Sequence, residues 1–295
     1  MCLAALSVDQ HRRYPFVLAA NRDEYYRRPT ARMGWWLLDG GGPVVLGGRD
    51  LQAGGSWCAL SAEGRLALVT NVRRPGSMDP GAPSRGAIVA RWLRGDEPSS
   101  RFWVQIGLEG YNPFNLVAFD FTRDERFWCG AEAAPRRLDS GLFGVSNALL
   151  DTPWPKVVAL KAATRSALAA TRSPQGLADR LFAALADPAP CADEDLPRTG
   201  IPLDRERSLS SAFVRMPGPT PELGYGTRSS IVVIVERTGA RTVTHLYERS
   251  WRSDGSLEAL RHAVLPDWPP APNAPRWSVD SARMTETEYP SPLPA

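Results

Sequence analysis

The opening of the chain most constrains the fold, because an apolar segment of strand length starts at the second residue. Residues 2–8 are apolar, and a short polar turn separates them from a second apolar run at 16–20. Two such runs on either side of a turn predict an antiparallel hairpin. The return strand ends in the polar run 21–24, so antiparallel pairing is expected to bring Asn21, Arg22 and Asp23 back toward Cys2.

Cys2 has a distinctive chemistry if Met1 is removed, because one residue then carries a thiol and an α-amine. A free α-amine has a pKa of ~7.7–8.0 and a cysteine thiol one of ~8.5, so the amine can act as a base. Arg22 would favour the thiolate by its charge, and Asp23 would hold or orient the amine. The alternative is an ordinary buried cysteine of an edge strand, the usual situation of a free thiol.

Composition excludes several classes of protein. The net charge of +3 comes from 35 basic and 32 acidic residues, a balance that does not suggest nucleic acid or a membrane surface as partner. The four cysteines lack CxxC spacing, so we predict reduced thiols in a cytoplasmic protein, with neither a disulfide framework nor a zinc site. No apolar run approaches ~18 residues and no signal peptide is evident, so no transmembrane segment is expected.

The hydrophobic pattern predicts a mixture of strands and helices. Strands are expected at 44–46, 57–60, 66–70, 115–120, 126–129, 141–146, 229–235 and 242–249, and helices at 87–95, 100–110 and, as two in series, 155–186. The segment 25–43 resembles a loop, and 187–208 a surface excursion. We predict one domain over residues 1–265, followed by a proline-rich tail over 266–295.

Two glycine-rich clusters, 47–48 and 54–55, lack the GxxxxGK[ST] pattern of a phosphate-binding loop. They are expected either to form ordinary tight turns or to permit close backbone approach, which would let Arg49, Asp50 and Trp57 turn toward a shared site.

Asparagines end several of the predicted strands. Asn21, Asn71 and Asn147 each follow an apolar run, and a fixed side-chain amide at such a position can donate to a developing oxyanion. The alternative is that these asparagines cap or turn the chain, as asparagine often does. Arg228 is expected at the mouth of the last predicted hairpin.

The run Asn-Arg-Asp-Glu at 21–24 is the signature of the NRDE family, also called the transport and Golgi organisation protein 2 family, which this chain resembles. The match is carried by several segments in order, which is more specific than any one of them. The supporting segments are Met1-Cys2, 47–50, 54–57, 70–71, 84–86, 111–116, 146–156 and 225–228.

The resemblance implies an α+β fold, a four-layer αββα sandwich of two antiparallel sheets, like that of the N-terminal-nucleophile hydrolases. It also implies that Cys2 attacks a non-peptide amide, ester or thioester of a small acyl compound, with its own amine as base. Arg22 and Asp23 would then tune the thiol. Asn71 and Asn147 would supply oxyanion or amine contacts, and Arg228 would complete the charge network.

The family resemblance equally implies a second function, a carrier of haem, acyl-CoA or lipid. The residues expected to bind such a ligand are Asn21, Arg49, Asp50, Trp57 and Arg73, with Trp35 and Trp36 nearby. No cofactor is required for the hydrolase, and haem would be a transported ligand. His11, His245 and His262 are expected to be structural rather than axial ligands, and no CxxCH motif is present. Homodimer formation is left open.

Overall fold

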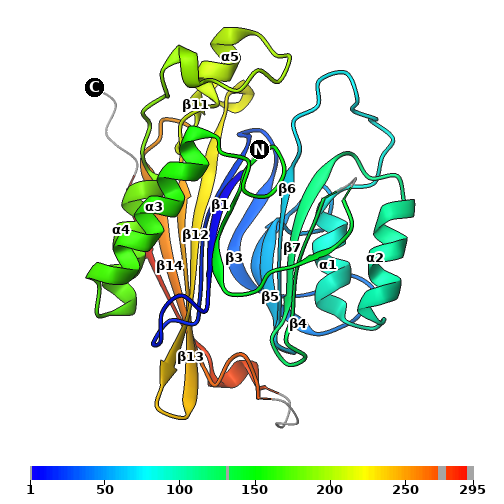
Figure 1. The fold of residues 1–295 in the computed structure, drawn as a ribbon, viewed down its shortest axis with the longest axis vertical. Helices are drawn as coiled ribbons and strands as arrows, with labels where there is room; N and C mark the ends of the chain where they lie inside the picture. The colour runs from blue at the N-terminus through cyan, green and yellow to red at the C-terminus, as the bar shows by residue number, and fades with distance from the viewer. Residues whose placement is uncertain (1, 131–132, 272–276, 291–295) are drawn as a thin grey trace.

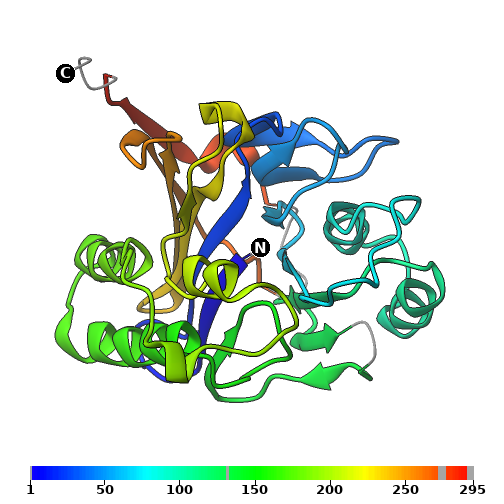
Figure 2. The ribbon, with the colours of Figure 1, turned by 90° about the horizontal axis from the view of Figure 1, so that it is seen from above.

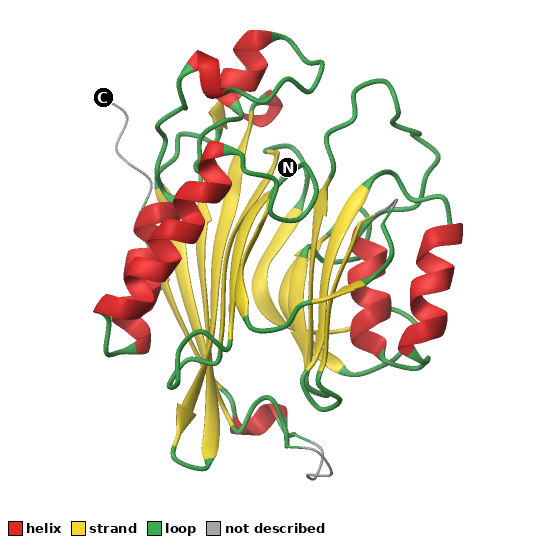
Figure 3. Ribbon diagram, in the orientation of Figure 1, coloured by secondary structure: helices red, strands yellow, loops and turns green. Residues whose placement is uncertain are grey.

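Two antiparallel β-sheets pack face to face, and helices cover their outer faces, as Figures 1 and 3 show. The computed structural model describes residues 2–130, 133–271 and 277–290. Met1 and parts of the predicted tail, 272–276 and 291–295, lie outside the described residues. The predicted α+β class and the four-layer αββα sandwich are confirmed.

The first sheet contains the amino-terminal hairpin near one edge. Its order is β10 (Gly141–Val145), β1 (Cys2–Val8), β2 (Phe16–Tyr25), β12 (Tyr225–Thr238), β13 (Arg241–Trp251), β14 (Leu257–Pro266) and β15 (Arg283–Glu288), with β11 (Arg215–Met216) paired to β12. Consecutive strands in this order pair antiparallel. The predicted hairpin forms, and β1 lies between two neighbours rather than at an edge.

The second sheet follows the chain order from strand to strand. Its members are β3 (Thr30–Leu37), β4 (Val44–Asp50), β5 (Cys58–Ser61), β6 (Arg65–Asn71), β7 (Phe114–Asp120), β8 (Glu125–Gly130) and β9 (Arg136–Arg137). Gly64 closes the predicted hairpin between β5 and β6 with a φ of +85°, a conformation that favours glycine. The segment 25–43 is not the expected loop, because 30–37 pairs with β4 as an edge strand.

Helices form the two outer layers. The helices α1 (Gly86–Arg94) and α2 (Ser99–Leu108) cover the second sheet, and α3 (Pro155–Ala170) and α4 (Pro174–Leu185) cover the first. All four were predicted. The expected excursion 187–208 contains the short helices η1 (Asp193–Asp195) and α5 (Leu203–Ser208), and η2 (Pro221–Leu223) and η3 (Val279–Ser281) are single turns.

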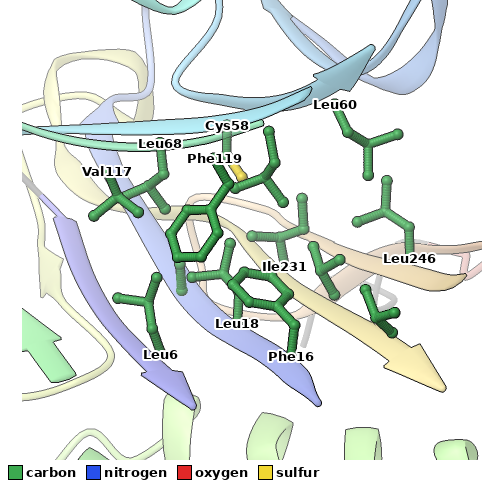
Figure 4. Close-up of a cluster of buried hydrophobic side chains, with 14 of the residues drawn as sticks. Leu6, Phe16, Leu18, Cys58, Leu60, Leu68, Val117, Phe119, Ile231 and Leu246 are labelled. Atoms are coloured by element: carbon green, nitrogen blue, oxygen red, sulfur yellow. The ribbon is translucent and has the colours of Figure 1, made fainter. Parts of the chain in front are cut away.

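Alternation along the hairpin decides which side chains enter which layer. On β1, Leu6 joins the core between the two sheets, whereas Leu3 packs under α3 and α4. Figure 4 shows Leu6, Phe16 and Leu18 of the first sheet meeting side chains of the second, among them Cys58, Leu68 and Phe119. By the same alternation, Cys2 belongs to the face between the sheets.

The chain after residue 265 is part of the domain rather than a separate tail. The strand β15 pairs with β14 and extends the first sheet. Trp268 is fully buried in the core between the sheets, and its Nε1 donates to the Ser61 carbonyl at 2.8 Å. The many prolines after residue 265 favoured a tail at the level of sequence, so neither the strand nor the buried tryptophan was predicted.

Candidate active site

A polar pocket of about 430 Å³ lies at the end of the sandwich where β1 begins. Figure 2 looks down on this end and shows β1, in blue, starting near the centre of the molecule. The lining includes residues of both sheets and of the start of α1. The lining includes the charged residues and three candidate site residues without charge, which together are Cys2, Arg22, Asp23, Glu24, Arg28, Asp50, Trp57, Asn71, Asp79 and Arg85.

Cys2 lies at the inner wall of this pocket and is 8% exposed. The hairpin register pairs Cys2 directly with Arg22, as the sequence predicted. Burial raises the pKa of the Cys2 thiol, while the charge of Arg22 and a hydrogen bond from the backbone of Asp23 act in the opposite direction. The thiol is therefore held mainly as the neutral form and needs a nearby base to become a nucleophile.

Arg22 brings a nearly buried positive charge to the pocket. Its guanidinium carbon lies 4.3 Å from the centre of the Trp57 ring, a cation–π contact. Its Nη2 is 3.9 Å from a carboxylate oxygen of Glu24 and the same distance from one of Asp50. Its Nη1 is buried and makes no hydrogen bond with the described residues. Stacking thus fixes the guanidinium, while its Nη1 has no acceptor among the described residues.

Asp23 is buried next to Cys2. Its Oδ1 accepts a hydrogen bond from Thr227 Oγ1 at 2.7 Å, and burial raises the pKa of this carboxyl while Lys156 opposes the shift. Lys156 approaches from α3, donates to the Leu209 carbonyl at 2.7 Å, and has a pKa lowered by burial to about 8. The buried cation of Lys156 therefore acts electrostatically on the buried Asp23 carboxyl and favours its charged form.

Asn71 reaches the pocket from the other sheet, at the end of β6. Its side-chain amide makes no hydrogen bond within the described part of the chain, whereas its backbone carbonyl accepts from Asn147 Nδ2 at 2.8 Å. Asn147 does not line the pocket and is 1% exposed. We conclude that Asn71 presents an available amide donor, and that Asn147 fixes the backbone from which it projects.

The glycine clusters do bring two of their three expected residues to the site. Asp50 and Trp57 line the pocket, but Arg49 does not. A Cβ on Gly48 would lie 2.1 Å from the Trp57 ring, so only glycine leaves room for the ring that supports Arg22. Arg49 instead forms an ion pair with Asp39 at 2.7 Å.

Two further predicted site residues, Asn21 and Arg73, also lie outside the pocket. Asn21 faces the helical layer, where its amide donates to the Leu185 and Ala212 carbonyls, because alternation sends it to the opposite face from its neighbour at 22. Arg73 pairs with Glu206 of α5. The structure therefore places neither side chain in the pocket.

Arg228 is kept out of the pocket by an irregularity in the sheet. The pairing of β12 with β2 shifts register between Thr227 and Ser229, and this bulge re-aims the arginine. Its Nη1 donates to the backbone carbonyls of Tyr25, Tyr26 and Arg28. Arg228 thus braces the segment after β2 rather than completing a charge network at Cys2.

The sequence did not identify four charged residues of the pocket, Glu24, Arg28, Asp79 and Arg85. Glu24 stands in the NRDE run, and Arg28 lies in the turn after β2, with its Nε 3.9 Å from a carboxylate oxygen of Glu24. In the structure Arg28 Nε donates to Asp50 Oδ2 at 2.7 Å. Arg85 lies immediately before α1, where no local pattern distinguishes it from a surface arginine.

The aromatic and arginine residues expected to bind haem do not gather in one place. Trp57 lines the Cys2 pocket. The guanidinium carbon of Arg49 lies 4.9 Å from the centre of the Trp36 ring, and that of Arg73 lies 5.1 Å from the centre of the Trp154 ring. No group of three or more metal-binding side chains occurs among the described residues. Any ligand of the Cys2 pocket would therefore meet mainly charged and amide groups.

A smaller cavity of about 280 Å³ shares Trp57 with the Cys2 pocket and contains a buried carboxyl. Glu248 is 1% exposed, and its Oε1 accepts from the Met33 backbone N–H at 2.7 Å. Burial raises the pKa of this carboxyl to about 7, so it is protonated in the folded state over a range where the unfolded chain has lost the proton.

We predict that Glu248 makes the protein less stable as the pH rises from about 4.5 to 7. In this window the folded state holds a proton that the unfolded state has released, so the free energy of unfolding falls by at most about 1.4 kcal/mol per pH unit. Urea unfolding of the wild type and of Glu248→Gln at pH 5 and pH 7.5 measures this. A stability difference between the two that does not change with pH would contradict it.

Fold and site together define the class: a four-layer αββα sandwich protein with a cysteine at residue 2 in a polar pocket between its sheets. The chain belongs to the Transport and Golgi organisation 2 family, whose family model matches residues 1–253. The predicted family is therefore confirmed. Within the described residues, no helix combines the length and apolar character needed to cross a bilayer.

Curated mammalian relatives cover most of the chain. The Transport and Golgi organization protein 2 homolog of Bos taurus is 34% identical over 244 residues, or 78% of this chain and 86% of the relative. The Homo sapiens homolog is 34% identical over 249 residues, and the Mus musculus homolog 30% over 243, with the same shares covered.

A solved structure of the C2A mutant of the conjugated bile acid hydrolase from Clostridium perfringens also matches. It shares 12% identity and a TM-score of 0.42, over 98% of this chain and 97% of that one.

Proposed function

We propose that this protein is a cysteine hydrolase of a non-peptide amide, ester or thioester, with Cys2 as nucleophile after removal of Met1. The observation that carries the proposal is convergence at one pocket. The thiol of Cys2 lies there with Arg22 and Asp23 from the paired strand and Asn71 from the opposite sheet. Such a nucleophile, charge and amide donor are the parts that acyl transfer requires.

The proposed reaction begins when the α-amine of Cys2 takes the thiol proton and the sulfur attacks the substrate carbonyl carbon. The carbonyl π electrons move to the oxygen, and the Asn71 amide donates to that oxyanion. Collapse breaks the bond to the leaving group, which receives the proton from the ammonium. Water then attacks the thioester and releases the acid, regenerating the thiol. Arg22 favours the thiolate, and Asp23 holds the ammonium.

Mass spectrometry of the purified protein tests the proposal. The chain is expected to begin at Cys2, and brief incubation with 4-nitrophenyl pentanoate is expected to add one pentanoyl group to the peptide that starts with Cys2. Retention of Met1, or acylation confined to Cys191, would contradict the proposal, because the amine or the nucleophile would then be the wrong one.

The alternative function, a carrier of haem or of an acyl-CoA, requires binding without turnover. Titration with haem, followed by the Soret band, separates the two functions. Saturable binding of one haem per chain, unchanged in Cys2→Ala and without any acyl adduct in the first experiment, would favour the carrier. We expect no saturable haem binding, because the arginine and tryptophan side chains proposed for it lie in separate places.

A further inference from the structure

Arg85 differs from the other arginines of the Cys2 pocket in having no carboxylate partner. It is half buried in the pocket wall just before α1, and its Nη1 donates to the Pro113 carbonyl at 3.2 Å. No ion pair joins it to another described residue. Arg28, by contrast, contacts Asp50 at 2.7 Å, and Arg22 has carboxylate oxygens at 3.9 Å.

The surroundings of Arg85 favour an additional negative charge. Burial lowers the pKa of its guanidinium, and the Cys2 thiolate and Glu24 act in the opposite direction, which places Arg85 within electrostatic range of the nucleophile. A half-buried cation without a counter-charge loses hydration without full compensation. The helix α1 starts at the next residue, and the positive end of its dipole adds to the same corner.

The carboxylates of the pocket have partners other than Arg85. Glu24 and Asp50 are shared with Arg28, and Asp23 accepts from Thr227. Asp79 is exposed at the rim, where its Oδ1 accepts from the Gly81 backbone N–H at 2.7 Å. The positive charges of Arg85 and of the amino-terminal end of α1 are therefore available to a ligand.

Arg22 supplies a second, independent indication of an anion. Its side chain is 5% exposed, and its buried Nη1 makes no hydrogen bond with the described residues while the guanidinium lines the same pocket. Two guanidinium groups with unused donors thus lie in one pocket beside the nucleophile.

We propose that Arg85 binds a carboxylate on the substrate, so that the enzyme acts on acyl compounds that carry a negative charge. This inference rests on the proposed function and specifies its substrate class. In a mono-ester of a dicarboxylic acid, the free carboxylate would meet Arg85 while Cys2 attacks the ester carbonyl. The ester C–O bond breaks, the alcohol or phenol of the ester leaves with the transferred proton, and water releases the diacid from the thioester.

Two esters that differ only in charge test the proposal, mono-4-nitrophenyl glutarate and the neutral 4-nitrophenyl pentanoate. We expect kcat/KM for the glutarate ester to fall roughly 10- to 100-fold in Arg85→Gln, as expected for loss of a hydrogen bond to a charged group, mainly through KM. The pentanoate ester should change less than about 3-fold, within the range of uncharged contacts. Arg85→Lys should lie in between, and Arg12→Gln, in the turn at the opposite end of the hairpin, is the matched control.

A binding experiment decides the proposal without catalysis. Glutarate at millimolar concentration should raise the thermal midpoint of the wild type and of Cys2→Ser, and neutral glutaramide should not. The rise should disappear in Arg85→Gln. Equal effects of the two compounds, or a glutarate effect that survives Arg85→Gln, would overturn the inference. Failure of every variant to hydrolyse either ester would instead overturn the proposed function and leave the glutarate result to stand on its own.

Discussion

Cys2→Ala is expected to lower kcat/KM for 4-nitrophenyl esters by roughly 10⁴-fold or more, the scale of loss when a catalytic nucleophile is removed. The reason is that no other cysteine lines the pocket, so no second thiol can take over the attack. Initial rates of 4-nitrophenol release measure the effect. The fold should persist, because the change removes one buried sulfur atom and leaves the backbone pairing of β1 intact.

Cys191→Ala is the matched control for this prediction. Cys191 is a free, partly exposed thiol outside the Cys2 pocket, so its removal should leave the rate unchanged. In Cys2→Ser a residual activity that rises with pH is expected, since the hydroxyl is a poorer nucleophile that depends even more on the base. Hydrolysis at the wild-type rate by Cys2→Ala would remove the proposed function altogether.

Trp268→Ala should reduce the free energy of unfolding by about 3–5 kcal/mol, the cost of emptying a buried aromatic site. The side chain is fully buried, and its indole N–H donates a hydrogen bond to the Ser61 carbonyl. The centre of its ring lies 5.5 Å from that of Phe121 in an edge-on contact. Equilibrium unfolding in urea measures the change. A loss of this size would mean that the segment after residue 265 completes the core.

Tyr289→Ala provides the comparison. This aromatic residue also lies beyond position 265 but is 38% exposed, so its loss should cost less than about 1 kcal/mol. Similar small effects at both positions would mean that residues after 265 contribute little to the fold, as the sequence first suggested.

The amino-terminal hairpin could be predicted because its information is local. Two apolar runs and a polar turn fix the pairing, and the pairing sets Cys2 opposite Arg22. Face alternation, also visible in the sequence, explains why Asn21 turns to the helices instead. The sequence identified Asn71 only as an amide at the end of a strand, because it does not show which strand ends lie together in the fold.

The remaining misassignments involve information that is not local. A bulge after Thr227 redirects Arg228, and such an insertion has no reliable sequence signal in a strand rich in serine and valine. Arg85 enters the pocket only because the second sheet brings α1 to the same end of the molecule as β1. Trp268 is buried although it lies in a segment whose many prolines are typical of a linker.

The interior position of β1 has a practical consequence for anyone producing this protein. The strand lies between β10 and β2, and Cys2 already forms part of a pocket wall. Any residues left ahead of it by an affinity tag or a protease scar would compete with small molecules for that space. Recombinant protein that carries its affinity tag at the carboxyl end is therefore the appropriate sample for assays of this site.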